Sequence, residues 1–281
     1  MLQRSFAILF LCLSAAPGKA EPVAVQITRA GGTTTATSPN FQICTSASQV
    51  DLESLARSCE QRRTELLRDW LTVDASAAGT DWTPRCTITI HQNKGGYQRA
   101  LGAGAGASVG CTTIRVQGRA ICERRIDVRA DADAWHVDAL PHELTHVVLA
   151  DRFGNRPLPL WADEGIGVLS ESVAKQQKRD EAALRAEGRT QPVTPANLLY
   201  DARATAKIPP DAFYARSADL VALLIARRDR PTFLSFLEEQ QARGSEAALR
   251  KTYGIEGVAQ LQKMWNERSA VASGPAAVAG R

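Results

Sequence analysis

The sequence His142-Glu143-Leu144-Thr145-His146 decides how the second half of this 281-residue chain folds and what it can bind. An α-helix turns by about 100° per residue, so the two histidines lie about 40° apart on one face, one turn apart along the axis. Two imidazoles in this arrangement can hold one zinc ion. Glu143 lies beside that face, where a carboxylate can act as a general base on a water molecule without binding the metal. The motif therefore predicts a helix that carries a zinc site.

The residues around the motif fit such a helix. Asp138 is placed to cap its start, and Pro141 falls in the first turn, where a missing N–H costs little. Gly154 is expected to end the helix. Leu144 and Val148 should face away from the metal side, toward the core.

A zinc site needs a third protein ligand, which we expect from residues 157–165, Pro-Leu-Pro-Leu-Trp-Ala-Asp-Glu-Gly. Glu164 follows His146 by eighteen residues, on a second helix that a short turn can fold back against the first. Asp163 is the competing carboxylate. Spacing alone leaves both residues open.

These two segments resemble the gluzincins of the peptidase MA-like superfamily, relatives of thermolysin and the aminopeptidases. The family pattern is His-Glu-x-x-His and then a second helix with Glu, often as Trp-x-x-Glu-Gly, which here reads Trp161-Ala-Asp-Glu164-Gly165. The likeness extends to Phe213-Tyr-Ala-Arg-Ser217, to the apolar stretch from Leu220 to Ile225, and to a segment ending at Trp265. It covers residues 135–268, about half of the chain.

The resemblance implies one catalytic zinc ion held by His142, His146 and Glu164. It favours Glu164 over Asp163 because Glu164 holds the place before Gly165.

The resemblance also implies catalytic roles. Glu143 would be the base and proton shuttle, and Tyr214 a candidate hydrogen-bond donor to the transition state, with a packed aromatic as the alternative for Tyr214. Thermolysin-type enzymes place an Asp four residues after the ligand Glu, where this chain has Val168. The sequence therefore leaves the partners of the metal ligands unidentified.

Composition excludes several classes of protein. The chain is 44% hydrophobic and 23% charged, unlike collagen-like or wholly disordered chains. A formal net charge of +4 is too small to indicate nucleic-acid binding, so we expect none.

The N-terminus has the features of an export signal. Arg4 precedes a short apolar run from Phe6 to Leu13, and the small residues Gly18 and Ala20 stand where a signal peptidase cleaves. We expect residues 1–20 to be removed and the mature protein to be periplasmic or secreted. It should have no stable membrane insertion, because no later segment reaches membrane-spanning length.

Signal cleavage leaves five cysteines: Cys44, Cys59, Cys86, Cys111 and Cys122. An oxidising compartment favours disulfides, but an odd number leaves at least one thiol unpaired. Cys59 falls on the apolar face of a helix, where a plain buried thiol is as reasonable as a disulfide. The sequence does not reveal the connectivity.

Hydrophobic periodicity predicts an α+β fold, with a β-rich N-terminal part containing a long helix and then a mostly helical half. The resemblance implies that this second half is zincin-like and catalytic. Residues 21–130 form the first part, residues 131–269 the second, and residues 270–281 a disordered tail. In the first part we expect short strands and a Gly/Thr/Ser-rich loop within residues 21–47 and an amphipathic helix over 49–71. The remaining expectations are a strand over 86–91, a Gly/Ala-rich connection over 93–110 with a flexible loop at 102–107, and a hairpin of 111–116 with 120–128. Residues 175–189 should form a charged helix or a mobile cover near the site.

These features predict an exported zinc-dependent peptidase that hydrolyses peptide bonds by a zinc-bound water activated by Glu143. Its partner is a peptide or protein substrate, and the hairpin before the catalytic helix can offer an edge strand for an extended peptide. The alternative is a catalytically silent zinc-binding or scaffold domain with the same fold. Cleavage preference, and attack at chain ends or internally, cannot be read from the sequence.

Overall fold

The computed structural model describes residues 23–71, 81–154, 156–188, 192–200 and 207–272, and the fold is α+β as predicted. The expected signal peptide lies outside the described residues. The first part of the chain contains β1 (Gln26–Ala30), β2 (Thr33–Thr37), β3 (Phe41–Thr45), α1 (Leu52–Leu71), β4 (Cys86–His91), α2 (Lys94–Leu101), the 3-10 helix η1 (Ala103–Ala107), β5 (Gly110–Gln117) and β6 (Ala120–Arg129). The second part contains α3 (Ala139–Phe153), α4 (Leu160–Val168), α5 (Val173–Glu187), α6 (Pro195–Tyr200), α8 (Pro210–Arg227), α9 (Arg230–Arg243), α10 (Ser245–Tyr253) and α11 (Val258–Ala272).

The six strands form one mixed sheet in the order β1-β2-β3-β4-β6-β5. The pairs β3–β4 and β4–β6 are parallel, and the other pairs are antiparallel. The predicted hairpin is β5–β6, and it leaves β5 at one end of the sheet.

Alternating apolar residues give the sheet a buried face. Ile43, Ile88 and Ile126 are in register across three neighbouring strands, and all three are fully buried. The intervening residues point to the opposite face, because side chains alternate along a strand. Burial of one face explains why this register is fixed: a slip by one residue would expose the whole row.

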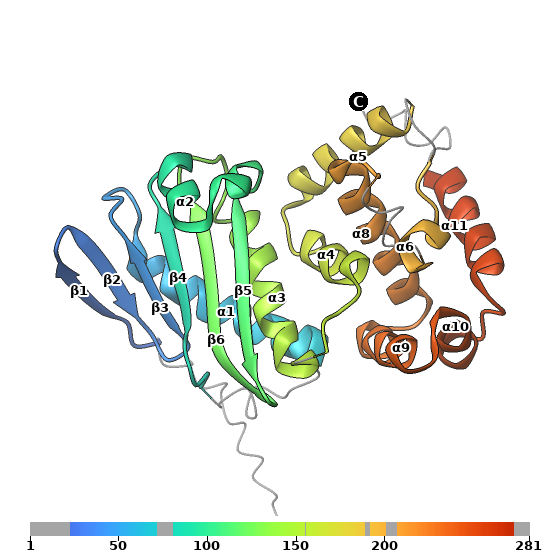
Figure 1. Ribbon diagram of the computed structural model, residues 1–281, viewed down its shortest axis with the longest axis horizontal. Helices are drawn as coiled ribbons and strands as arrows, with labels where there is room; N and C mark the ends of the chain where they lie inside the picture. The colour runs from blue at the N-terminus through green and yellow to red at the C-terminus, as the bar shows by residue number, and fades with distance from the viewer. Residues whose placement is uncertain (1–22, 72–80, 155, 189–191, 201–206, 273–281) are drawn as a thin grey trace, which may run out of the picture.

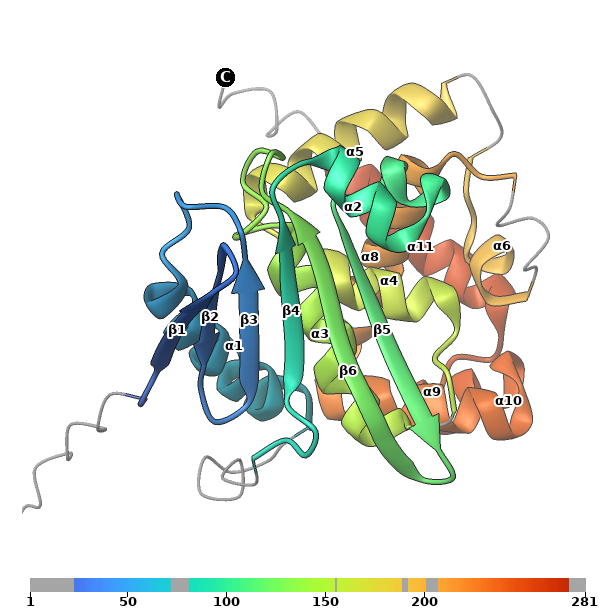
Figure 2. The same ribbon diagram turned by 60° about the vertical axis from the view of Figure 1, so that its left-hand side comes forward.

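Helices α1 and α3 cover the buried face of the sheet, as Figures 1 and 2 show. Helix α1 packs on β2 and β3, α3 packs on β5 and β6, and the two helices touch each other. Helices α4 to α11 form the other side of the molecule (Figure 1), where α4 packs on α8. One hydrophobic core nevertheless runs through both sides and includes Trp70, Trp82 and Trp135.

Two local predictions in the N-terminal part were wrong. The Thr-rich segment Thr33–Thr37 is strand β2, because pairing with both β1 and β3 satisfies its backbone. The segment expected to be a Gly/Ala-rich connection contains helix α2, whose first turn is capped by the Asn93 side chain accepting a hydrogen bond from the Gly96 N–H, and then η1.

Two helix ends also differ from the predictions. Asp138 stands at the start of α3 but its side chain does not cap the helix; its carboxylate accepts a hydrogen bond from the Ser172 N–H at 3.2 Å. Helix α11 continues to Ala272, so residues 270–272 are helical and not part of a disordered tail as predicted. The rest of the expected tail, residues 273–281, lies outside the described part. Pro141 in the first turn of α3 and Gly154 at its end are confirmed. None of the helices in the described segments is long and apolar enough to cross a membrane.

The five cysteines after the expected signal are all free thiols. Cys59 and Cys86 are buried, and burial raises the pKa of both, that of Cys86 to about 12. The buried-thiol reading of Cys59 is therefore confirmed, and Cys59 and Cys86 contribute to the core by packing.

Candidate metal centre

Helices α3 and α4 bring the three predicted ligands together. His142 and His146 lie one turn apart on α3, with ring centroids 4.9 Å apart. Glu164 comes from α4, and its Oε2 lies 3.1 Å from Nε2 of His142. One potential ligand atom from each of the three residues lies within 4.8 Å of the other two. Two imidazoles and one carboxylate that leave further positions open are a donor set typical of catalytic zinc sites.

A glycine lets α4 approach the first histidine so closely. A Cβ atom at Gly167 would lie 2.7 Å from Cε1 and 2.8 Å from Nε2 of His142. Any side chain at this position would push the ring or the helix away. The absence of a side chain at Gly167 is therefore what allows the ligands of α3 and α4 to converge.

Each histidine is held by a different carboxylate through the nitrogen on the far side of its ring. Nδ1 of His142 lies 2.9 Å from Oε1 of Glu171, and Nδ1 of His146 lies 2.8 Å from Oδ1 of Asp163. An ionised carboxylate can only accept, so both Nδ1–H groups donate. This fixes the ring orientation and leaves Nε2 for a metal. Asp163, the competing ligand candidate, thus contacts the back of His146.

Glu171 belongs to a larger buried cluster. Its side chain is 2% exposed and accepts two hydrogen bonds from Arg179 of α5, both at 2.6 Å. The Arg179 guanidinium in turn lies 4.6 Å from the ring centroid of Tyr214. Burial alone would raise the pKa of Glu171, but His142 and Arg179 outweigh it and lower that pKa. The carboxylate therefore stays ionised and able to orient His142.

The predicted base Glu143 is held by strand β5. The Thr112 hydroxyl lies 2.7 Å from Oε2 of Glu143 and 3.0 Å from its backbone carbonyl oxygen, and it can donate to either. A Cβ atom at Gly110 would lie 2.7 Å from Cγ and from Oε1 of Glu143. The edge strand thus passes directly over the base and restricts its position.

The charges around the two histidines favour their protonated forms in the metal-free protein. Burial alone would lower the pKa of His142, but hydrogen bonds with Glu164 and Glu171 raise it to about 10. Burial likewise acts against protonation of His146, and Asp163 overcomes it and raises the pKa. A site that stabilises a positive charge between carboxylates is also suited to a divalent cation, which would replace the proton at Nε2 of His142.

Tyr214 faces the same cavity. Its ring centroid lies 6.3 Å from that of His142, and it lines the cavity together with His142, Glu143 and Glu164. Burial and, next, the charge of Glu164 raise the pKa of Tyr214 to about 12, so its hydroxyl keeps its proton at neutral pH. Tyr214 therefore lines the cavity with a protonated hydroxyl, and its role as a donor stays a prediction.

The structure brings the three ligand candidates and the candidate base together, and their roles stay predictions; sequence reasoning missed the residues that hold them. The missed residues are Gly110, Thr112, Gly167, Glu171 and Arg179, together with the contact of Asp163. Glu171 follows Glu164 by seven residues, beyond the end of α4, where no fixed helical spacing points to it.

Comparison of the sequence with protein-family models and with curated proteins finds no match to either. The assignment of the site therefore depends on its own geometry.

Proposed function

We propose that this chain is an exported zinc-dependent peptidase that hydrolyses peptide bonds at the centre formed by His142, His146 and Glu164. The observation that carries the proposal is the pairing of each histidine Nδ1 with its own carboxylate, at 2.9 and 2.8 Å, beside a third carboxylate that faces the remaining ring nitrogen of His142. A base that is not one of the ligands, Glu143, completes the set.

A zinc ion held there would lower the pKa of a water molecule and polarise a substrate carbonyl. Glu143 would take a proton from the attacking water and deliver it to the nitrogen of the breaking amide bond. Thr112 keeps the Glu143 carboxylate in place, and the Tyr214 hydroxyl can donate to the oxygen that becomes negative. Water adds to the carbonyl carbon, the C–N bond breaks, and the products are a carboxylate and an amine.

The substitution Glu143→Gln in the zinc-loaded mature protein, beginning at residue 21, tests the proposal. We expect zinc content to stay at one ion per chain while hydrolysis of a mixed peptide library falls by about 100-fold or more, because general-base catalysis is lost. Glu181→Gln is the matched control: Glu181 lies on α5, and its side chain is 68% exposed.

Two results would contradict the proposal. One is a Glu143→Gln protein as active as the wild type. The other is a wild-type protein that holds its zinc but cleaves no peptide, which would favour the silent zinc-binding domain instead.

A further inference from the structure

The space around the metal centre extends to both sides of it. One cavity of about 650 Å³ and a second of about 480 Å³ both reach His142, Glu143 and Tyr214. The first continues along β5 and α3 toward Phe153, and the second continues toward α5 and the start of α8. A bound chain therefore has room on both sides of a bond placed at the metal centre.

Among the described strands, β5 is the last of the sheet, so its outer edge can pair with a bound peptide. The Thr112 carbonyl oxygen there has one weak contact, with Sγ of Cys111 at 3.9 Å. The Val109 carbonyl accepts a hydrogen bond from the Arg129 N–H at 3.1 Å. Pairing alternates along an antiparallel ladder, so the N–H and C=O groups of Gly110, Thr112 and Ile114 point away from β6, toward the side where the sheet ends. An extended peptide can pair with these groups, and antiparallel pairing is the more stable arrangement.

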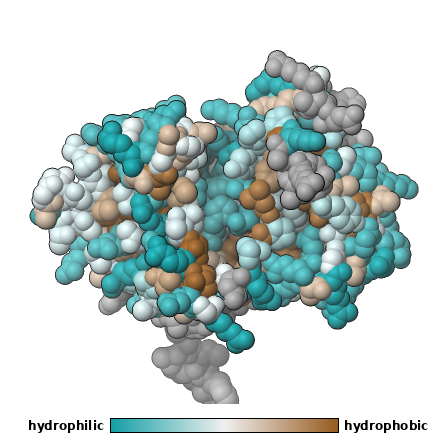
Figure 3. Space-filling view, in the orientation of Figure 1, coloured by the Kyte–Doolittle hydropathy of each residue, from teal (hydrophilic) through white to brown (hydrophobic). Residues whose placement is uncertain are grey.

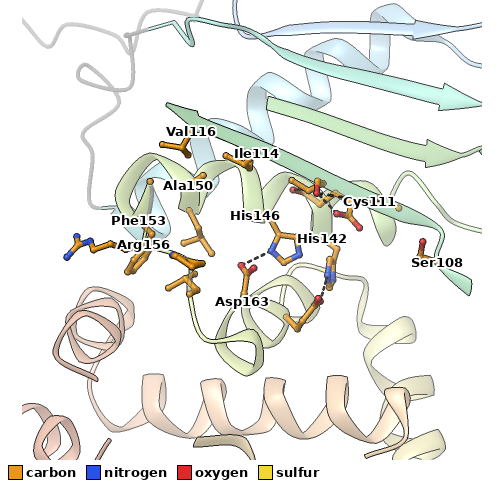
Figure 4. Close-up of a pocket in the computed structure, with 18 of the residues that line it drawn as sticks. Ser108, Cys111, Ile114, Val116, His142, His146, Ala150, Phe153, Arg156 and Asp163 are labelled. Carbon is orange, nitrogen blue, oxygen red and sulfur yellow. Dashed lines mark hydrogen bonds and ion pairs between the residues drawn. The ribbon is translucent and has the colours of Figure 1, made fainter. Parts of the chain in front are cut away.

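The first cavity is apolar beyond the ligands. Ile114 and Val116 of β5 point to the same side as Thr112, and they face Ala150 and Phe153 of α3 (Figure 4). The remaining apolar lining comes from Leu149, Pro157 and Leu158. Figure 3 shows a hollow between the sheet and the helical side of the molecule, with hydrophobic surface along its lower part. Apart from residues of α3 and α4, Arg156 is the charged residue that lines the first cavity.

The second cavity combines charged residues with apolar ones, among them Val109, Trp135 and Pro210. Its lining includes Asp133, Asp138, Lys175, Arg179 and Asp211. Arg179 is held by Glu171, so this side presents fixed as well as exposed charges. The two cavities together form one groove, and each cavity is one arm of it. The second arm has more charged residues in its lining, so burying an apolar side chain there costs more than in the first arm.

We propose that the groove binds internal segments of extended polypeptides and requires a large apolar side chain on the amino-terminal side of the bond that is cut. Antiparallel pairing with β5 directs the amino-terminal part of the substrate toward Ile114 and Val116, because β5 runs from the metal centre toward those residues. Polar residues are accepted on the carboxyl-terminal side. The inference rests on the proposed function and adds the substrate class and the internal position of the cut.

The first test maps the cut sites of the zinc-loaded wild-type protein in a peptide library by mass spectrometry. We expect internal cuts, and Leu or Phe preferred over Ala by about tenfold or more within the residues just before the bond, because apolar pockets discriminate by about this factor. A preference on the carboxyl-terminal side, no preference, or removal of terminal residues alone would overturn the inference and leave the proposed function standing.

The second test measures binding without hydrolysis. Zinc-loaded Glu143→Gln is titrated with fluorescent peptides that contain Leu or Asp at the selected position, and the Leu peptide should bind at least tenfold more tightly. Apolar-selective binding together with no hydrolysis by the wild type would overturn the proposed function and support the groove. Absence of both binding and hydrolysis would overturn both.

Variants of the strand locate the selectivity. Ile114→Glu, and Val116→Ser as a milder change in the same wall, should reduce the preference for Leu by about tenfold. Thr113→Glu is the matched control, because Thr113 is exposed and points to the other face of β5. A preference that Ile114→Glu and Val116→Ser leave unchanged, in proteins with wild-type circular dichroism, would overturn the assignment of the apolar arm.

Discussion

Substitution of Glu171 should weaken zinc binding although Glu171 is not a ligand. Its Oε1 lies 2.9 Å from Nδ1 of His142, and its side chain is 2% exposed. Glu171→Gln keeps an oxygen that can accept from the imidazole N–H but loses the negative charge. Glu171→Ala loses both and leaves His142 free to turn.

The expected magnitudes follow from these contacts. Loss of a partner that orients a histidine ligand typically costs 10–100-fold in metal affinity, or about 1.4 to 2.7 kcal/mol. We place Glu171→Gln near the lower value and Glu171→Ala near the upper value. Glu171→Ala should also destabilise the fold by about 3 kcal/mol, because it strands Arg179, whose side chain is 16% exposed.

Zinc affinity is measured by competition with a chromophoric chelator, and stability by urea unfolding of the metal-free proteins. Glu181→Gln removes the same charge from an exposed position of α5 and should change neither value. If Glu171→Ala binds zinc within twofold of the wild-type affinity while its circular dichroism is unchanged, Glu171 does not orient the ligand.

Three further predictions concern the base, the ligands and the core. Thr112→Val should lower kcat about tenfold at unchanged zinc content, because the hydroxyl donates to Glu143; unchanged steady-state kinetics would contradict this. Zinc binding at pH 7 should release at least one proton, that of His142, whose pKa is raised to about 10 without metal. Calorimetry in buffers of different ionisation enthalpy measures the number of protons released, and release of none would refute the exchange of proton for metal. Burial raises the pKa of Cys86 to about 12. The neutral thiol therefore contributes fully to the free energy of unfolding below the pKa of the unfolded thiol, near pH 9, and this contribution is lost as the pH rises toward 12. Urea unfolding from pH 8 to 10.5 should therefore show a shallower loss of stability for Cys86→Ala than for the wild type, and equal slopes would count against this.

The centre of the site was predictable because it follows from local periodicity. Two histidines four residues apart must share a helix face, and the apolar residues Leu144 and Val148 between and after them fix which face is buried. The choice of Glu164 over Asp163 came from resemblance and stays a prediction. In the structure Glu164 faces Nε2 of His142, and Asp163 contacts Nδ1 of His146.

The supporting residues could not be predicted because tertiary packing brings them together. Thr112 meets Glu143 across thirty-one positions of sequence, and Glu171 meets His142 across twenty-nine. Neither pair is set by helical or strand spacing. The prediction for the Gly/Ala-rich segment was wrong for a related reason. Its weak intrinsic helix propensity suggested a loop, but capping by Asn93 and contacts of α2 with β4 and β6 favour a helix there.

The close approaches at Gly110 and Gly167 limit how this protein can change over generations. Every missense mutation at a glycine codon adds at least one carbon, and at these two positions the first added carbon would already overlap Glu143 or the His142 ring. Descendants that keep the metal centre should therefore keep both glycines, even where the apolar arm of the groove drifts toward other substrates. In newly sequenced genomes, a His-Glu-x-x-His segment accompanied by glycines at both equivalent positions would distinguish true relatives of this chain from chance matches.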